Sequence, residues 1–218
     1  MTERTGLART ISSQLITYIR NRILDGSYAA GTALLQDAIA AEFGVSKIPV
    51  REALVQLSAE GLVDVFAHRG FQVRGTSVSE LDELFRLRLQ IEPDAVANGA
   101  RLATTAEQRE VKQLLDALNA ATESQDPKVA DLNRSFHLAL ICPAQQPITA
   151  EVLGRLLVRS QRYVLRHLAP QGRTRRAKTE HNVLHRLWLK QDADGLQEAT
   201  RTHIVRTHDD LRQLLSAH

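Results

Sequence analysis

The stretch GVSKIPVREALVQLSAEGLVDVFAHRGFQV, residues 44–73, changes its pattern of hydrophobic residues halfway along. Between residues 50 and 57 the hydrophobic residues recur at steps of three and four, which places them on one face of a helix. Gly61 ends this pattern, and two short β-prone runs follow at residues 63–66 and 71–73. The stretch therefore predicts a helix followed by a β-hairpin.

Two further helices are predicted upstream. Hydrophobic residues recur at helical spacing from Ile11 to Ile23, and a short helix follows at about residues 36–43. Gly44 lies in the tight turn before the next helix, for which Ser46 is the expected N-cap. The order helix, helix, turn, helix, hairpin is that of a winged helix-turn-helix module, which we assign to residues 1–75.

Downstream of a short linker, Gly75–Val78, the hydrophobic spacing is helical throughout. Three helix starts carry capping signals, namely Ser79 with Asp82, Thr104 with Glu107, and Asp126 before Pro127. We expect helices at residues 79–103, 105–124, 127–142, 147–168, 174–191 and 193–217. The predicted fold class is mainly α, with an all-α bundle of six helices over residues 76–218.

The composition is that of an ordinary folded protein, with 218 residues of which 43% are hydrophobic and 24% charged. The single cysteine, Cys142, excludes an internal disulfide framework. Neither a membrane span nor a secretory signal is evident, so we expect a cytoplasmic protein with no membrane partner. The net charge is +3, and the first 75 residues hold 8 basic against 7 acidic side chains. Total charge therefore does not indicate nucleic-acid binding by itself.

The positions of a few basic residues are more informative. Lys47 and Arg51 are four residues apart near the start of the third predicted helix, so they share an exposed face with Ser46. A helix in the major groove presents its N-terminal residues to base edges, where arginine can bind guanine. Arg69, at the tip of the hairpin, would reach a minor groove or a phosphate. The alternative is a solvated basic face without a ligand.

Seven of the eight histidines lie in the second half of the chain. Asn133 and His137 are four apart on one predicted helix, so their side chains can meet, and His181 and His203 come from two later helices. Three imidazoles and one oxygen would form a divalent-metal site with open positions, and imidazole suits zinc and nickel. Two alternatives remain, namely histidines of the core or surface without a metal, and a rival pair of His181 with His185.

Three segments resemble the signature of the GntR family of bacterial transcription regulators: GVSKIPVREAL (44–54), EGLV (60–63) and RGFQV (69–73). The resemblance implies a dimeric DNA-binding regulator. It also implies DNA contacts at the matching positions, which are Ser46, Lys47, Ile48, Pro49, Arg51 and, in the wing, Gly70.

Three positions depart from that family's pattern. Lys47 replaces the usual arginine and Ile48 the usual threonine, and because lysine is a point charge rather than a planar fork, base discrimination there should differ. Asp37 stands where many members have an arginine that approaches DNA. Its carboxylate would repel phosphate, so we assign no DNA contact to it.

The bundle is similar to the FCD ligand-binding domain of GntR regulators, through the segments RLQIE (88–92), NRSFH (133–137), EH (180–181) and RTHI (201–204). In that family an Asp or Asn joins three histidines around a metal, which implies Asn133, His137, His181 and His203 here. Asparagine is the less usual choice, and its neutral oxygen binds a cation less strongly than a carboxylate does. Six helices resemble the VanR-like subgroup rather than the seven-helix FadR-like one.

Together these features predict a transcription regulator, most simply a repressor, rather than an enzyme. A homodimer would place two recognition helices on half-sites of a palindromic operator in double-stranded DNA. A small carboxylate effector would bind in the metal-containing cavity, where Arg88 would complete a carboxylate clamp. The alternative for Arg88 is a pair with Glu92, four residues on, at the helix surface.

Two other functions remain open. A metal-dependent hydrolase would use His137, His181 and His203 to activate water, although the sequence contains no HExxH motif. The second is a helical interaction protein whose histidines have a structural role only.

Overall fold

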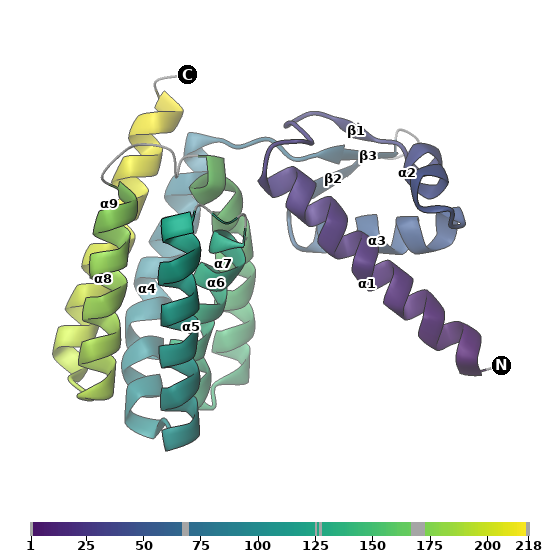
Figure 1. Ribbon diagram of the computed structural model, residues 1–218. Coiled ribbons are helices and arrows are strands. Elements are labelled where there is room, and N and C mark those ends of the chain that lie inside the picture. Colours follow the sequence, from purple (N-terminus) through teal and green to yellow (C-terminus); the bar gives the residue numbers. More distant parts are fainter. Residues whose placement is uncertain (1, 67–69, 125, 127, 167–172, 217–218) are drawn as a thin grey trace. The chain divides into compact units, whose positions relative to one another are not determined.

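The computed structural model describes residues 2–66, 70–124, 126, 128–166 and 173–216. The chain divides into two compact units, residues 1–76 and 77–218 (Figure 1). The first is a winged helix-turn-helix and the second an all-α bundle, so the predicted fold class is confirmed. None of the helices in the described ranges combines the length and the hydropathy that crossing a bilayer requires.

The helices of the first unit are α1 (Thr2–Leu24), α2 (Gln36–Phe43) and α3 (Lys47–Ala59). α1 and α2 both pack against α3, and hydrophobic side chains from α1 and α3 are fully buried between them. Gly44 ends α2 with a φ of +61°, a left-handed conformation that glycine adopts without steric cost, and its N–H bonds to carbonyls of α2. This turn sets the angle at which α3 begins.

The predicted hairpin is present as β2 (Val63–Phe66) and β3 (Gly70–Val73), which pair antiparallel with Phe66 opposite Gly70. A third strand, β1 (Ala33–Leu34), pairs with the other edge of β3 and gives the order β1-β3-β2. The sequence did not predict β1, because two residues are too few to display an alternating pattern.

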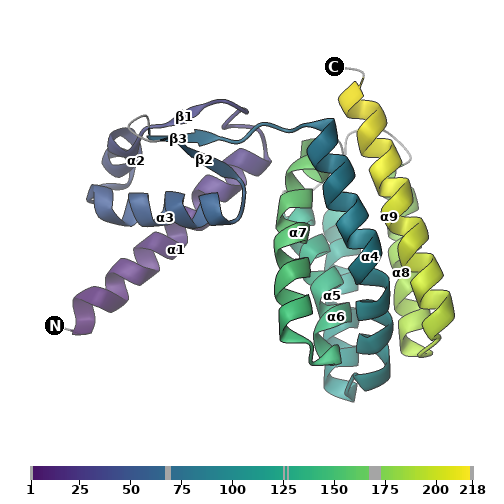
Figure 2. The same cartoon turned by 180° about the vertical axis from the view of Figure 1, so that it is seen from behind.

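The bundle contains α4 (Val78–Leu102), α5 (Thr105–Ser124), α6 (Val129–Ile141), α7 (Pro147–Arg166), α8 (Arg173–Leu189) and α9 (Ala193–Ser216), with a 3₁₀ turn, η1 (Cys142–Ala144), after α6. These helices lie alongside one another (Figures 1 and 2). α4 is central, because it contacts α6, α7, α8 and α9. Residues on α4 can therefore reach side chains from most of the bundle.

The helix starts test the capping predictions. The Thr104–Glu107 capping box is confirmed, since each residue's side chain bonds to the backbone N–H of the other. The prediction for Ser79 with Asp82 is wrong: Ser77 is the N-cap of α4, and its Oγ accepts from the backbone N–H of Glu80. The same S-x-x-acid spacing begins two residues earlier, where the backbone is still extended.

α6 also begins later than predicted, at Val129. The carboxylate of Asp126 accepts from the N–H of Lys128, two residues on, which forms a turn ahead of the helix instead of capping it. Pro127, predicted as the first helical residue, lies outside the described residues.

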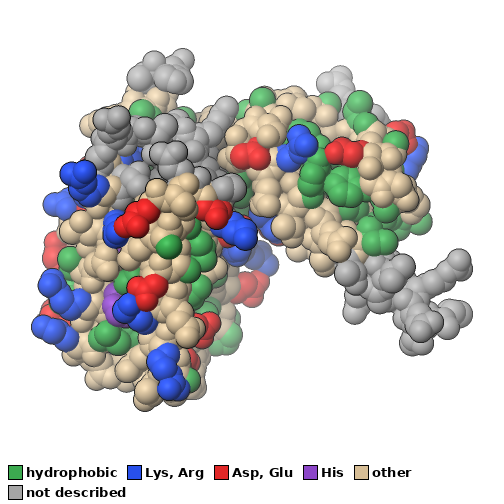
Figure 3. Space-filling model, viewed as in Figure 1, with side chains coloured by type: hydrophobic (Ala, Val, Ile, Leu, Met, Phe, Trp, Pro, Cys, Tyr) green, Lys and Arg blue, Asp and Glu red, His purple; other side chains and the backbone are tan. Residues whose placement is uncertain are grey.

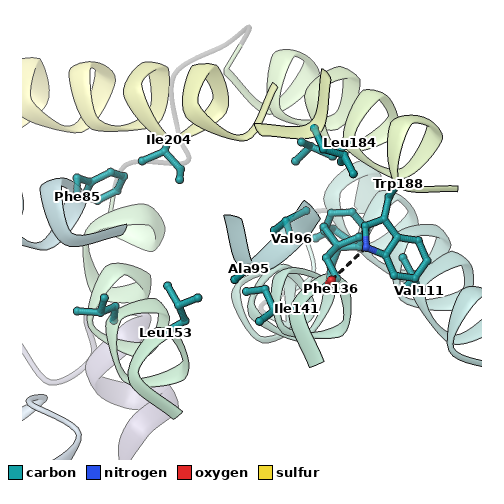
Figure 4. Packing of buried hydrophobic residues seen from close by; sticks show 14 of the residues in the cluster. Phe85, Ala95, Val96, Val111, Phe136, Ile141, Leu153, Leu184, Trp188 and Ile204 are labelled. Carbon is teal, nitrogen blue, oxygen red and sulfur yellow. Dashed lines mark hydrogen bonds between the residues drawn. The ribbon is translucent and has the colours of Figure 1, made fainter. Parts of the chain in front are cut away.

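The core of the bundle is centred on large side chains that are fully buried, among them Phe85, Phe136 and Trp188. The Trp188 indole Nε1 donates a 3.0 Å hydrogen bond to the carbonyl of Leu140, the dashed line in Figure 4. α4 approaches α6 closely at the same carbonyl, since a Cβ placed on Gly99 would lie 2.0 Å from the Leu140 oxygen. α4, α6 and α8 therefore meet at one backbone group.

Candidate functional site

His137 from α6, His181 from α8 and His203 from α9 come together inside the bundle. All three are buried, and each offers a ring nitrogen such that the three nitrogens lie within 4.8 Å of one another. Their ring centroids are 4.9 to 5.4 Å apart. This arrangement of three imidazoles is the donor set of a divalent-metal site.

A carboxylate lies behind two of the three rings. His137 Nδ1 is 2.8 Å from Glu92 Oε1, and His203 Nδ1 is 2.8 Å from Glu180 Oε2. Because an ionised carboxylate only accepts hydrogen bonds, Nδ1 is the donor on both rings, and in a neutral imidazole the lone pair is then on Nε2. The buried Nε2 atoms of His137 and His181 have no hydrogen-bond partner among the described residues. A ring nitrogen with a free lone pair can bind a cation by donating that pair to it.

Glu92 is held in turn by Arg88. The Arg88 Nε donates to Glu92 Oε2 at 2.8 Å and its Nη2 to Glu92 Oε1 at 3.2 Å. The alternative predicted for Arg88, a pair with Glu92, is therefore present, but it is buried rather than at the helix surface, because the two side chains are only 5% and 0% exposed. The sequence analysis assigned no site role to Glu92, although its place in the RLQIE segment was the available signal.

The charges in this cluster follow from its burial. Burial by itself would raise the pKa of Glu92, but the charge of Arg88 and the hydrogen bond from His137 outweigh burial and hold that pKa well below its usual value. Burial lowers the pKa of His137, and it lowers the pKa of His181 further below the usual value, with the neighbouring histidines adding to the effect. At neutral pH Glu92 is therefore ionised and these two imidazoles are neutral, the forms that a metal site requires.

A cavity opens beside the histidines, with about 80 Å³ of space for water-sized groups. Its lining brings together the residues that the sequence predicted for the bundle site, namely Arg88, Asn133, His137, His181 and His203. Aliphatic side chains form other parts of the wall, among them Leu118, Val129, Leu157 and Leu211. The lining of the cavity thus combines polar and apolar side chains, as is typical of small-molecule sites.

His185 does not belong to this cluster. It is buried one helical turn after His181, but the charges that act on it are those of Lys112 and Asp116 on α5. The three ring nitrogens that converge are those of His137, His181 and His203.

The start of α3 presents most of the residues assigned to DNA contact. Ser46, Lys47, Ile48 and Arg51 are exposed there. Pro49 is an exception, because its side chain is buried and fixes the first turn of α3 from inside the unit. Among the other assigned residues, Gly70 starts β3 with a φ of +86°, and Arg69 lies outside the described residues.

Asp37, in the first turn of α2, forms an ion pair with Lys47 at 2.5 Å. The side chains are 75% and 66% exposed, so the pair lies on the surface beside the start of α3. Elsewhere, acidic and basic side chains are interspersed over the face of the bundle in view in Figure 3. The basic side chains on that face therefore form no continuous positive patch.

Two family models match the chain. Residues 11–73 match bacterial regulatory proteins of the gntR family, and residues 83–206 match the FCD domain. Both matches coincide with the units described above.

Individual relatives agree with these matches. The HTH-type transcriptional regulator McbR of Escherichia coli K12 is 30% identical over 151 residues, which are 69% of this chain and 68% of McbR. The HTH-type transcriptional repressor RspR of the same strain is 26% identical over 220 residues, or 98% of this chain and 95% of RspR. The solved structure of E. coli McbR/YncC superposes with a TM-score of 0.80 at 25% identity, covering 94% of this chain and 98% of that one.

Proposed function

Since the chain belongs to the gntR family of bacterial regulatory proteins and carries an FCD domain, it is a transcriptional regulator, and we propose that a small carboxylate bound in its bundle controls its affinity for operator DNA. The family and the relatives are regulators rather than enzymes. The alternative of a metal-dependent hydrolase has no support from them.

DNA recognition is assigned to the start of α3. Arg51 would read a base edge in the major groove, and the hydroxyl of Ser46 with the N-terminal amides of α3 would bind phosphate. The Ser46 side chain makes no capping hydrogen bond in α3, which supports this role because the exposed hydroxyl remains available. Lys47, Ile48 and Gly70 would lie against the same DNA face.

The histidine cluster is assigned to a divalent metal, zinc or nickel, held by His137, His181 and His203, with Asn133 as an oxygen donor from the cavity wall. The fit is supported by the buried Nε2 atoms of His137 and His181, which have no hydrogen-bond partner among the described residues, and by the carboxylates that accept from Nδ1 of His137 and His203. When bound, the ion would supply positive charge and open positions for a carboxylate. Glu92 and Glu180 orient the rings of His137 and His203.

Arg88 has a narrower role than a free clamp. Its guanidinium is engaged by Glu92 on two nitrogens, yet it lines the cavity. We assign it to the effector site as a fixed positive charge that also keeps Glu92 ionised. The effector would therefore meet a charge whose position does not change on binding.

Several finer assignments follow from the family. We infer a homodimer that binds a palindromic operator, which fits a single winged unit per chain. A repressor is supported by the name of the RspR relative, and the VanR-like subgroup by the six α-helices in the described part of the bundle. A regulator that binds the bacterial chromosome acts in the cytoplasm.

The single observation that carries the metal and effector assignment is the convergence of three buried imidazoles on one cavity. It also separates this proposal from a helical interaction protein, because structural histidines satisfy both ring nitrogens from the protein. Metal analysis of untagged protein tests it: about one zinc or nickel per chain is expected, with loss of the metal in His137→Ala. Absence of metal from protein purified and dialysed with zinc would contradict it.

The DNA assignment has a separate test. Equilibrium binding of the full chain to fragments from its own genomic neighbourhood should weaken steeply with salt, because phosphate contacts release counterions. Arg51→Ala should lose specific binding by roughly 1–3 kcal/mol while binding to random duplex changes little. Unchanged specificity in Arg51→Ala would remove α3 from its assigned role.

A further inference from the structure

Ile48 is an exposed aliphatic side chain in the first turn of α3, on the face assigned to DNA. It is 69% exposed, and among the large hydrophobic residues in the described ranges only Ile148, on α7, is more exposed. Single exposed hydrophobic residues are common on protein surfaces, so exposure alone assigns no function. The position of Ile48 distinguishes it, because Lys47 precedes it and Arg51 follows within one turn, and both of these basic side chains are exposed.

The first turn of α3 holds the Ile48 side chain outward. Pro49 and Val50, which follow directly, are both buried, so their side of the turn packs inside the unit. Proline fixes its own φ, and a β-branched isoleucine has one strongly preferred χ1 rotamer in a helix. Ile48 therefore loses little conformational freedom when a ligand covers it.

The chemistry of Ile48 restricts what it can recognise. Its side chain has no hydrogen-bonding atom, so it offers no polar contact to a base edge or a phosphate. In the major groove, guanine, adenine and cytosine are distinguished by hydrogen-bond donors and acceptors, and thymine alone adds a methyl group, at C5. An isoleucine against another base would cover polar atoms without replacing their hydrogen bonds to water. The thymine methyl is thus the partner that suits this side chain.

The neighbouring basic residues limit where that thymine can lie. Lys47 forms a surface ion pair with Asp37, whereas Arg51 is on the same exposed face of α3 as Ile48, three residues on. Side chains at this spacing have Cβ atoms about 5–6 Å apart. Successive bases along a strand are about 3.4 Å apart, so the two side chains meet bases that are one or two steps from each other.

Resting on the assignment of α3 to operator DNA, we propose that Ile48 selects a thymine in the operator by covering its C5 methyl group. This thymine lies within about two base pairs of the base that Arg51 reads. Ile48 is thereby a specificity-determining residue whose contact removes apolar surface from water and releases no counterions.

Replacing thymine by deoxyuridine tests the contact, because it removes the methyl group and leaves the hydrogen-bonding groups of the base unchanged. Selection from a random duplex library with the full chain first identifies the preferred operator, and each of its thymines is then replaced in turn. At one thymine, fluorescence anisotropy should show binding weakened by about fourfold, as expected for one buried methyl group. The ratio should be the same at low and high salt, because no phosphate contact is lost.

Three variants assign the contact to Ile48. Ile48→Ala should bind the thymine and uridine duplexes equally at that position, whereas Ile48→Val keeps a β-branched side chain and should retain most of the preference. Val55→Ala is the matched control, because Val55 is also an exposed aliphatic residue of α3, at 52%, but lies seven residues further from its start. It should keep the fourfold preference. Thermal unfolding checks that each variant folds.

The outcomes separate this inference from the DNA assignment on which it rests. The contact is overturned alone if the preferred operator has no thymine near the base read by Arg51, if no uridine replacement weakens binding, or if it weakens the wild type and Ile48→Ala by the same factor. Loss of the preference in Val55→Ala as well would also overturn it. If the full chain selects no sequence, or if Arg51→Ala keeps the wild-type specificity, the DNA assignment of α3 fails and this inference fails with it.

Discussion

Asp37 places a negative charge beside the start of α3, where it pairs with Lys47. Exposed ion pairs contribute little to stability, so its consequence lies in DNA binding. The Asp37 carboxylate forms an ion pair with the Lys47 ammonium group, and it would repel a phosphate that approaches the first turn of α2. Lys47 is thus restrained from acting as a general phosphate contact.

The substitution Asp37→Asn should therefore increase affinity for random duplex. Freeing one lysine for a phosphate contact should steepen the slope of log affinity against log salt by about 0.9. Fluorescence anisotropy at several salt concentrations measures that slope. Glu110→Gln, an exposed carboxylate on α5, is the control for net charge, and a slope no steeper than in this control would count against the explanation.

His181 makes the stability of the metal-free protein depend on pH. Burial lowers its pKa in the folded state, whereas the unfolded chain has the ordinary value near 6.5. Below about pH 6.5 the unfolded state binds more protons, so the free energy of unfolding should fall by up to about 1.4 kcal/mol per pH unit. Urea unfolding in chelator between pH 7.5 and 5.5 measures this, and His181→Gln should make the dependence shallower, while His137 and His185, whose pKa values burial also lowers, keep part of it. If the free energy of unfolding of His181→Gln depended on pH as steeply as that of the wild type, groups other than His181 would cause the dependence.

At the scale of single residues, the sequence predicted the histidine cluster better than the residues that support it. Helical spacing and the family pattern pointed to His137, His181 and His203, which the structure brings together. Glu92 was not predicted, because its role depends on burial against other helices rather than on its own neighbours in sequence. Pro49 was expected at the DNA face, whereas its side chain is buried, and its family position does not reveal which way that side chain faces.

At the scale of elements, signals within a helix determined its bounds well. α5 was predicted as residues 105–124, as observed, because its capping box and its hydrophobic period lie within the segment itself. α6 was predicted two residues early, because an aspartate before a proline also suits a turn. β1 was not predicted, because it is stabilised by pairing with β3, a segment that is distant in the sequence.

Gly99 tests the close approach of α4 and α6. Alanine favours a helix over glycine by about 1 kcal/mol, but a Cβ at this position would meet the Leu140 carbonyl. Gly99→Ala should therefore destabilise the bundle by about 1–3 kcal/mol through overpacking. The matched control is Gly154→Ala on α7, where the nearest atom would be at 3.8 Å and stability should hold or rise slightly. Chemical denaturation measures the free energy of unfolding of both variants. Equal stability of Gly99→Ala and Gly154→Ala would contradict the close contact between α4 and α6.

At the scale of the whole molecule, α7 connects the effector cavity with the beginning of the bundle. Gln161 lines the cavity, and two residues later the Tyr163 hydroxyl lies 3.4 Å from both the N–H and the carbonyl of Ser77 and 3.0 Å from Glu80 Oε2. Ser77 lies within the predicted linker, Gly75–Val78, and is the first residue of the bundle unit. A shift of α7 on effector binding would therefore act, through Tyr163, on Ser77, where the chain enters the bundle from the winged unit.

Tyr163→Phe removes that hydroxyl and should weaken the coupling rather than the binding at either site. Acid affinity and operator affinity measured separately should stay within about twofold of the wild type. The change in operator affinity caused by acid should shrink several-fold, because a link worth about 1 kcal/mol is lost. Coupling as large as in the wild type would exclude this contact from the connection.

The central claim is that an acid in the histidine-lined cavity alters DNA binding by the winged unit. Operator affinity of the wild-type protein, measured by anisotropy against increasing concentrations of the small carboxylate that calorimetry shows to bind best, tests it most directly. We expect the affinity to change by about 5–150-fold and to level off when the cavity is saturated. An operator affinity that stays constant while calorimetry shows the cavity filled would contradict the claim.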